Sequence, residues 1–382
     1  MALVLNEDQQ LLKDSAQSFC QQLAPVSLLR RLRDSKDETG FDRDVWKQMV
    51  DLGWAGMAIP EAYGGYGFGY GGLGVVLEET GRTLVSSPLI STVLLAATAI
   101  NELGSEEQKQ ELLPKIVAGE LLVALALDEN SSHAPSRIGT KAEKSGDGFI
   151  LSGAKTFVLD GHVAQKLIVV ARSSGEIDSR QGLSLFLVDA GLEGIAISRT
   201  HMVDCRNAAK IEFSQVEVAA DALLGEVDAG FDGLDKVLDI ARIGLAAEML
   251  GSIQEVFERI LDFLKTREQF GILIGSFQGL QHRAATMYSE IELCKSVVRA
   301  ALAGLDDSGK SRQDIAELAS IAKAKLSEVF FEVSNEGIQM HGGIGMTDEF
   351  DIGFFLKRAR VAQHFLGDAS FHRDRYASLN NF

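Results

Sequence analysis

The amino-acid sequence predicts an α+β protein in which an antiparallel β-domain separates two helical domains. Apolar residues recur about every 3.6 positions in the first third of the chain and again after about residue 230, whereas the middle third contains short apolar runs of strand length. All five prolines lie at or before Pro135, so the remainder of the chain permits long helices. We expect an N-terminal helical domain over residues 1–119, a β-barrel or β-sandwich over 120–224 and a four-helix bundle over 225–382.

The first domain carries recognisable helix signals. Asn6 can cap a helix whose apolar face includes Leu12, Ala16 and Phe19. Ser105 to Gln108 has the pattern of a capping box and precedes another apolar face. These signals predict several helices joined by turns.

The middle domain contains runs of strand length separated by Gly, Asp and Ser turns. No segment long enough for a crossover helix lies between them, so we expect antiparallel pairing rather than βαβ units. The expected strands lie at residues 149–151, 157–159, 167–171, 183–188 and 195–197.

The last domain returns to helical periodicity. Leu234, Leu238, Ala241 and Leu245 form one apolar stripe. Two further long helices are expected, from about residue 278 to 305 and from 314 to about 338. Their lengths are typical of a helical bundle.

Composition excludes several classes of function. With 37 Lys and Arg against 54 Asp and Glu, the net charge of −17 disfavours binding to nucleic acid or to an anionic membrane surface. No apolar run approaches 18 residues, and the N-terminus lacks the features of a signal or transit peptide. The three cysteines have no metal-site spacing. We expect reduced thiols, a cytoplasmic location and no bound metal.

A glycine-rich stretch contains the pattern GxGxxG at Gly69, Gly71 and Gly74. A dinucleotide fingerprint of this kind requires a preceding strand and a βαβ unit. Helical patterns surround it here, so close backbone packing is the favoured interpretation.

Arg267 to Gly271 follows a long predicted helix, and Gln339 to Gly345 forms a second glycine-containing segment. An Arg at a helix C-terminus often only balances the helix dipole. An Arg beside Gln, with a glycine segment downstream, can also bind a diphosphate. The residues alone leave both interpretations open.

Several motifs, in the same order along the chain, resemble those of the acyl-CoA dehydrogenase family. The similarity extends over residues 59–345, and the motifs together are far more specific than any one of them. They are Ile59 to Gly65, Gly104 to Lys109, Leu113 to Lys115, Gly153 to Lys155, Arg267 to Gly271 with Gln278, and Gln339 to Gly345.

The resemblance implies a fold of helical, β and helical domains, FAD bound at a subunit contact, and a tetramer. By position, one subunit would hold the diphosphate and adenosine with Arg267, Gln269, Phe270 and Gln278. Gln339 and Gly343 would approach the cofactor from a neighbouring subunit, and Leu127, Asp128 and Phe157 fall where the β-domain lines the flavin.

The resemblance also implies an oxidoreductase of fatty acid metabolism and lipid degradation. In this family a Glu takes the α-proton of an acyl-CoA thioester while the β-hydride goes to flavin N5. The product is a trans-2-enoyl-CoA, and an electron-transfer flavoprotein receives the electrons. A carboxylate in a dry site has the raised basicity that this step needs.

The sequence departs from the family at both customary positions of that base. Leu366 occupies one and Ala241, before Arg242, occupies the other, so neither can accept a proton. Leu159 replaces a hydroxyl residue of the β-domain. Glu248 and Asp368 are nearby carboxylates, but we expect structural or solvated roles for both. The catalytic residue is therefore not assigned.

This pattern resembles the small subunits of heteromeric acyl-CoA dehydrogenases, in which a partner chain carries the Glu. Such enzymes act on bulky or unusual thioesters, including those of dicarboxylic acids and steroid side chains. Three hypotheses remain: a flavoenzyme that works alone with an unusual base or beside a Glu-bearing partner, a non-catalytic subunit that completes a neighbour's FAD site, or a flavoprotein of this fold with another reaction.

Overall fold

A computed structural model describes residues 4–382 of the chain. The chain divides into two compact units. The first, here called the helical unit, comprises the chain up to Arg31 together with Tyr70–Val85 and Arg242–Phe382. The second, the mixed unit, comprises Leu32–Gly69 and Ser86–Ala241.

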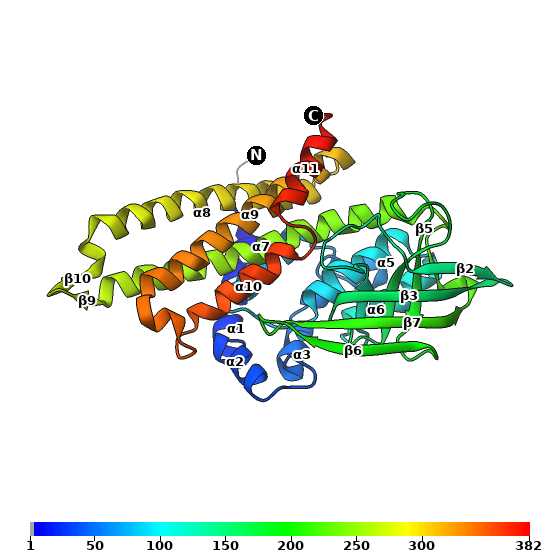
Figure 1. The fold of residues 1–382 in the computed structure, drawn as a ribbon, viewed down its shortest axis with the longest axis horizontal. Helices are drawn as coiled ribbons and strands as arrows, with labels where there is room; N and C mark the ends of the chain where they lie inside the picture. Colours follow the sequence, from blue (N-terminus) through cyan, green and yellow to red (C-terminus); the bar gives the residue numbers. More distant parts are fainter. Residues whose placement is uncertain (1–3) are drawn as a thin grey trace. The chain divides into compact units, whose positions relative to one another are not determined.

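Helices precede and follow the β-strands along the chain (Figure 1). The α-helices are α1 (Glu7–Leu23), α2 (Val26–Asp34), α3 (Arg43–Asp51), α4 (Gly69–Arg82), α5 (Thr98–Leu103), α6 (Glu106–Val117), α7 (Gly230–Thr266), α8 (Gln278–Leu305), α9 (Arg312–His341), α10 (Ile352–His364) and α11 (Ala369–Leu379). The cap predicted at Asn6 and the capping box predicted at Ser105 are confirmed, and Asn6 also forms a capping box with Gln9.

The bundle of the helical unit is built from long helices packed side by side, with α9 in contact with α8, α10 and α11 (Figure 1). α4 crosses α7 with almost no space between the two backbones. A Cβ added at Gly81 would lie 1.9 Å from the carbonyl oxygen of Glu248, and one at Gly251 would lie 1.7 Å from that of Glu78. Only glycine permits this approach.

The glycine-rich stretch has the packing role that the sequence favoured. It forms the start of α4, where the backbone N–H groups of Tyr70 and Gly71 donate to the Asp306 carboxylate at 2.9 and 2.8 Å. A Cβ at Gly74 would lie 2.5 Å from the Leu302 side chain. The helix N-terminus already holds a carboxylate where a pyrophosphate would have to bind.

The mixed unit contains an eight-stranded sheet, counted over the described residues. Its strands run in the order β6 (Ile195–His201), β7 (Asn207–Val218), β3 (Gly148–Leu159), β2 (Lys141–Ser145), β4 (Lys166–Arg172), β5 (Leu183–Asp189) and β8 (Leu223–Leu224), and β1 (Val123–Ala126) pairs with β4. Most pairings are antiparallel, as predicted. β4, however, pairs in parallel with β1 and, through one residue pair, with β2.

Two expected strands proved to be one. The apolar runs at 149–151 and 157–159 both belong to β3, which is bulged between Lys155 and Val158 against β7. Sequence reasoning also missed β7, because its apolar positions alternate with Lys, Glu and Ser instead of forming a run. β3 and β7 contribute to the sheet's core, where the rings of Phe149 and Phe186 pack edge to face at 5.0 Å.

Among residues 4–382, no helix is long and apolar enough to cross a bilayer. All three cysteines are free thiols. Cys20 and Cys294 are buried, and burial raises the pKa of each thiol to about 12. Cys205 is only half-buried.

Candidate functional site

The segment after α7 forms a small hairpin at one end of the helical unit (Figure 1). Strands β9 (Glu268–Gln269) and β10 (Ile272–Leu273) pair antiparallel. The two-residue turn, Phe270 and Gly271, has φ of +57° and +77°. This is the conformation of a tight hairpin turn, and glycine at its second position is the favoured residue.

The hairpin presents polar and aromatic side chains outward. Arg267, Gln269 and Gln278 are exposed, and Phe270 is 92% exposed although its ring lies only 6.4 Å from that of Phe277. A phenylalanine so exposed adds nothing to this chain's own core.

The second predicted segment lies at the C-terminus of α9. Gln339 and Gly343 are exposed, and Gly342 ends the helix with φ of +61°. Gly343 does not have a left-handed φ, and a Cβ added there would meet nothing within 4 Å. The Gly343 backbone is therefore open to the surroundings of the chain.

Stacked rings bring the end of α9 onto the end of α7. The His341 ring lies 4.4 Å from that of Phe263, one turn before Arg267, and 5.0 Å from that of Phe350. Burial lowers the pKa of His341, and its Nδ1 lies 2.7 Å from the carbonyl oxygen of Gly337. The neutral His341 ring, stacked on Phe263 and Phe350, holds the segment from Gln339 to Gly343 beside the C-terminal end of α7, where the hairpin begins.

In the mixed unit, the structure brings Leu127, Asp128 and Phe157 together. The backbone N–H of Thr156 donates to the Asp128 carbonyl at 2.8 Å, and Lys155 Nζ donates to the Leu127 carbonyl at 3.0 Å. Phe157 lies in the bulge of β3 with φ of +52°, and its side chain is 41% exposed. The bulge turns an aromatic ring out of the regular alternation of the strand.

A buried ion pair supports this corner of the sheet, and sequence reasoning did not single it out. Lys155 Nζ lies 2.9 Å from Glu129 Oε1, and the Glu129 carboxylate also accepts from the backbone N–H groups of Gly139 and Thr140. Burial lowers the pKa of Lys155 to about 8. Burial opposes ionisation of Glu129, but the Lys155 ammonium holds the pKa of that carboxyl below its usual value.

The two customary base positions are buried and apolar. Ala241 is fully buried in α7, and Leu366 is 2% exposed in the turn between α10 and α11. Leu366 has φ of +60° and Gly367 has φ of +101°, so two successive residues adopt the left-handed region. Such a turn persists only where its surroundings hold it.

Three buried basic side chains hold that turn. Arg242 Nε and His372 Nε2 donate to the Leu366 carbonyl at 3.2 and 3.0 Å. Lys323 Nζ donates to the carbonyls of Gly367 and Gln363 at 2.7 and 3.1 Å. Burial, reinforced by the nearby Arg242, lowers the pKa of Lys323 to about 7. No sequence signal identified Lys323, because it belongs to an Ala-Lys-Ala-Lys run whose helical periodicity does not distinguish it from Lys325.

The two substitute carboxylates have structural roles. Glu248 is buried in α7 and pairs with Arg358 Nη1 at 3.5 Å. Asp368 caps α11, accepting from the Phe371 backbone N–H at 2.8 Å. These contacts agree with the roles expected from the sequence.

Three family descriptions match consecutive parts of the chain: "Acyl-CoA dehydrogenase, N-terminal domain" over residues 6–120, "middle domain" over 126–216 and "C-terminal domain" over 228–378. The chain belongs to the acyl-CoA dehydrogenase family. It has that family's fold of N-terminal helical, middle β and C-terminal helical domains, and FAD is the cofactor of these enzymes.

Relatives of this chain include the mitochondrial isovaleryl-CoA dehydrogenase of Pongo abelii, 32% identical over 97% of this chain and 88% of that protein. The caffeyl-CoA reductase-Etf complex subunit CarC of Acetobacterium woodii is 28% identical over 94% of each chain. A chain of the ChsE4-ChsE5 complex from Mycobacterium tuberculosis superposes with a TM-score of 0.89, at 25% identity, over 100% of this chain and 99% of that one.

The exposed groups suit a dinucleotide. A guanidinium and amides can donate to phosphate oxygens and adenosine, and an exposed aromatic ring can pack against a base. The open space at Gly343 would let the backbone come close to such a ligand. These features fit the cofactor of the family, whereas Leu366 and Ala241 do not supply the family's usual base.

Proposed function

We propose that this chain takes part in FAD-dependent α,β-dehydrogenation of an acyl-CoA thioester beside a partner subunit that carries the catalytic Glu. An electron-transfer flavoprotein would accept the electrons. The proposal rests on the contrast between the cofactor-binding residues and the base positions. The dinucleotide-type groups at the hairpin and at the end of α9 remain exposed, while both base positions hold buried apolar side chains.

Residues of this chain would bind and orient FAD. Arg267, Gln269, Phe270 and Gln278 would hold its diphosphate and adenosine, and Leu127, Asp128 and Phe157 would lie against the flavin. Gln339 and Gly343 would contact the cofactor of a neighbouring subunit. When bound, FAD supplies the two-electron acceptor that the reaction needs.

Removal of the α-proton requires a side chain that this chain lacks at the customary positions. Neither Leu366 nor Ala241 can accept a proton. Asp368 accepts a hydrogen bond as a helix cap, and Glu248 is paired with Arg358, so each has a structural task. A carboxylate supplied by a related subunit at its own site is the simplest source of the base.

A second candidate function is a non-catalytic subunit that only completes a neighbour's FAD site. The exposure of Gln339 and Gly343 at the end of α9 favours it, because these residues would serve the neighbour's cofactor rather than the chain's own. A flavoprotein of the same fold with a different reaction is the third possibility, and it needs no α-base.

Visible spectroscopy of the purified chain separates these functions. We expect a flavin band that bulky acyl-CoA thioesters bleach, with a dye acceptor, only after a Glu-bearing homologue is co-expressed. A band that bleaches with the chain alone would mean that it carries its own base. No bleaching with any partner would favour the third function, and no flavin without the partner would favour the second.

One substitution tests the cofactor assignment. Arg267→Ala should lower the ratio of flavin to protein after purification, because a guanidinium that contacts the diphosphate is lost. Arg373→Ala is the matched control, since Arg373 is also exposed and pairs with Glu328 on the bundle surface. Equal flavin content in the two variants would contradict the role of Arg267.

A further inference from the structure

The segment that joins α9 to α10 contains Gly343, one of the residues assigned above to a neighbour's cofactor. We call this segment, residues 342–351, the α9–α10 connection. Most of its residues are exposed, and the backbone N–H of Thr347 donates only locally, to the Ile344 carbonyl at 3.1 Å. A segment that buries so little apolar surface depends on contacts at its two ends for a fixed position.

The first end of the connection is held by packing. The His341 ring directly precedes it and lies against the rings of Phe263 and Phe350. Gly345 fits closely against the last turns of α9, since a Cβ added there would lie 2.8 Å from the Ile338 carbonyl oxygen. These contacts fix the start of the connection but not its end.

Arg30, on α2, holds the other end, and it belongs to the same helical unit. Its Nη1 donates to the backbone carbonyl of Asp348 at 2.6 Å and to the carboxylate of the same residue at 3.0 Å. Its Nη2 donates to the Asp351 carboxylate at 2.8 Å. The guanidinium also lies 4.9 Å from the centre of the Phe354 ring, on the first turn of α10. One side chain therefore fixes both the backbone and the side chains at the end of the connection.

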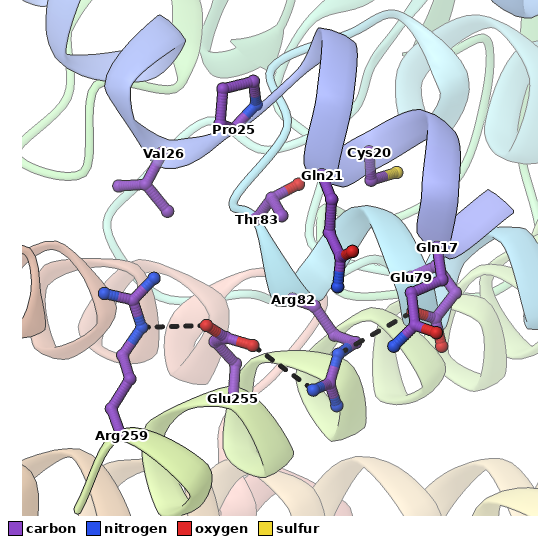
Figure 2. A pocket seen from close by; sticks show the side chains of 10 residues that line it. All are labelled: Gln17, Cys20, Gln21, Pro25, Val26, Glu79, Arg82, Thr83, Glu255 and Arg259. Carbon is purple, nitrogen blue, oxygen red and sulfur yellow. Dashed lines mark hydrogen bonds and ion pairs between the residues drawn. The ribbon is translucent and has the colours of Figure 1, made fainter. Parts of the chain in front are cut away.

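Asp351 does not have the role that its position suggests. It stands at the N-cap of α10, where an Asp side chain usually accepts from the N–H groups of its own helix. Its carboxylate makes no such bond and faces Arg30 and Arg259 instead, with Arg259 Nη1 3.7 Å away. Arg259 also pairs with Glu255, which pairs with Arg82 in the cluster between α1, α4 and α7 (Figure 2). Asp351 thus links the start of α10 to α2 and α7.

The geometry of these contacts requires an arginine at position 30. The planar guanidinium reaches a backbone carbonyl and two carboxylates at once through two of its nitrogens. A lysine ammonium is a single point charge, so it could pair with one carboxylate but could not hold all three acceptors.

We propose that Arg30 is a positioning residue for the cofactor site of the neighbouring subunit. By holding the α9–α10 connection at Asp348 and Asp351, it keeps the backbone at Gly343 where that backbone can approach the neighbour's FAD. This inference rests on the proposed function, which assigns Gly343 to that cofactor.

Hydrogen–deuterium exchange tests the structural part of the proposal on the flavin-loaded protein, co-expressed with its Glu-bearing partner if the chain alone holds no flavin. Arg30→Met should speed amide exchange in residues 342–351 at least about tenfold, because the connection then opens more easily, and should leave exchange in α8 unchanged. Arg373→Met is the control, since Arg373 pairs with Glu328 elsewhere on the bundle surface. Unchanged exchange in the connection of Arg30→Met overturns the proposal.

The rate of FAD release, followed by flavin fluorescence after dilution, tests the functional part. Arg30→Met should release FAD about tenfold faster than the unchanged protein, as expected for one lost hydrogen bond to a charged group. Arg30→Lys should fall between the two, and Arg373→Met should match the unchanged protein. A purely structural role for Arg30 would change stability but not the release rate measured on the folded protein.

A double variant separates this inference from the proposed function. Gly343→Leu should itself speed FAD release, because its side chain would occupy the open space that the cofactor needs. Arg30→Met should add little in that background, since both changes act on the same contact. If Gly343→Leu leaves release unchanged, the assignment of Gly343 is wrong and this proposal is wrong with it. If Gly343→Leu speeds release but Arg30→Met does not, or if the two effects multiply, only the role of Arg30 is refuted.

Discussion

Installing a carboxylate at position 366 is the sharpest test of the missing-base hypothesis. Leu366→Glu places the side chain that the family customarily has into a turn whose backbone is already fixed. The carbonyls of Leu366 and Gly367 are held by Arg242, His372 and Lys323, and none of these contacts involves the residue's own side chain. The backbone of this turn should therefore keep its conformation when Glu replaces Leu366.

The structure sets the size of both expected effects. Leu366 is 2% exposed, so losing its burial costs about 2 kcal/mol of the free energy of unfolding. Two buried basic side chains at the turn, Arg242 and Lys323, should offset part of the cost of burying a carboxylate. A positioned general base contributes about 10²- to 10⁴-fold in rate, so acyl-CoA-dependent flavin reduction should rise at least about 100-fold.

The assay is stopped-flow bleaching of the flavin band at a series of pH values. The rate of Leu366→Glu should rise with pH as the new carboxyl deprotonates, because only the carboxylate accepts a proton. Leu366→Gln is the matched control, with the same length and no basic oxygen. If Leu366→Glu retains FAD but reacts no faster than Leu366→Gln, the inference that this chain lacks only the base is wrong.

Three further predictions concern the supporting residues. Lys155→Met should lower the free energy of unfolding by about 3–5 kcal/mol, because it leaves Glu129 buried without its cation. In urea titrations, the double variant Lys155→Met/Glu129→Met should be less destabilised than Lys155→Met, because it removes both charges. Lys323 has a folded-state pKa lowered to about 7 by burial, so the unfolded chain binds more protons above that pH, and stability should rise between about pH 7 and 10.4 by up to about 1.4 kcal/mol per pH unit. In Lys323→Met, the free energy of unfolding should not show this rise with pH. If the unchanged protein and Lys323→Met have the same pH dependence of unfolding, the prediction is wrong. Phe270→Ala should change the free energy of unfolding by less than about 0.5 kcal/mol, since the ring is 92% exposed, yet it should lower FAD content or subunit association, measured by absorbance and sedimentation.

The sequence alone determined the order of helical, β and helical domains. Hydrophobic periodicity is a local property, so it identified α8 at 278–305 and the capped starts of α1 and α6 directly from neighbouring residues. The family motifs also lie in short segments, which is why the order of residues along the chain was enough to single out Arg267, Gln339 and Leu366. The absence of a carboxylate at 366 and 241 is likewise visible in the sequence.

Tertiary structure decided what those residues contact. Periodicity could not show that β3 is one bulged strand, because bulges depend on the partner strand rather than on the strand itself. It could not show that Lys323 closes the 363–367 turn, that Lys155 pairs with Glu129, or that Arg30 holds the α9–α10 connection. Those side chains come from segments far apart in the chain, and burial by distant neighbours, not local sequence, determines the charge state and hydrogen-bonding needs of an ionisable group.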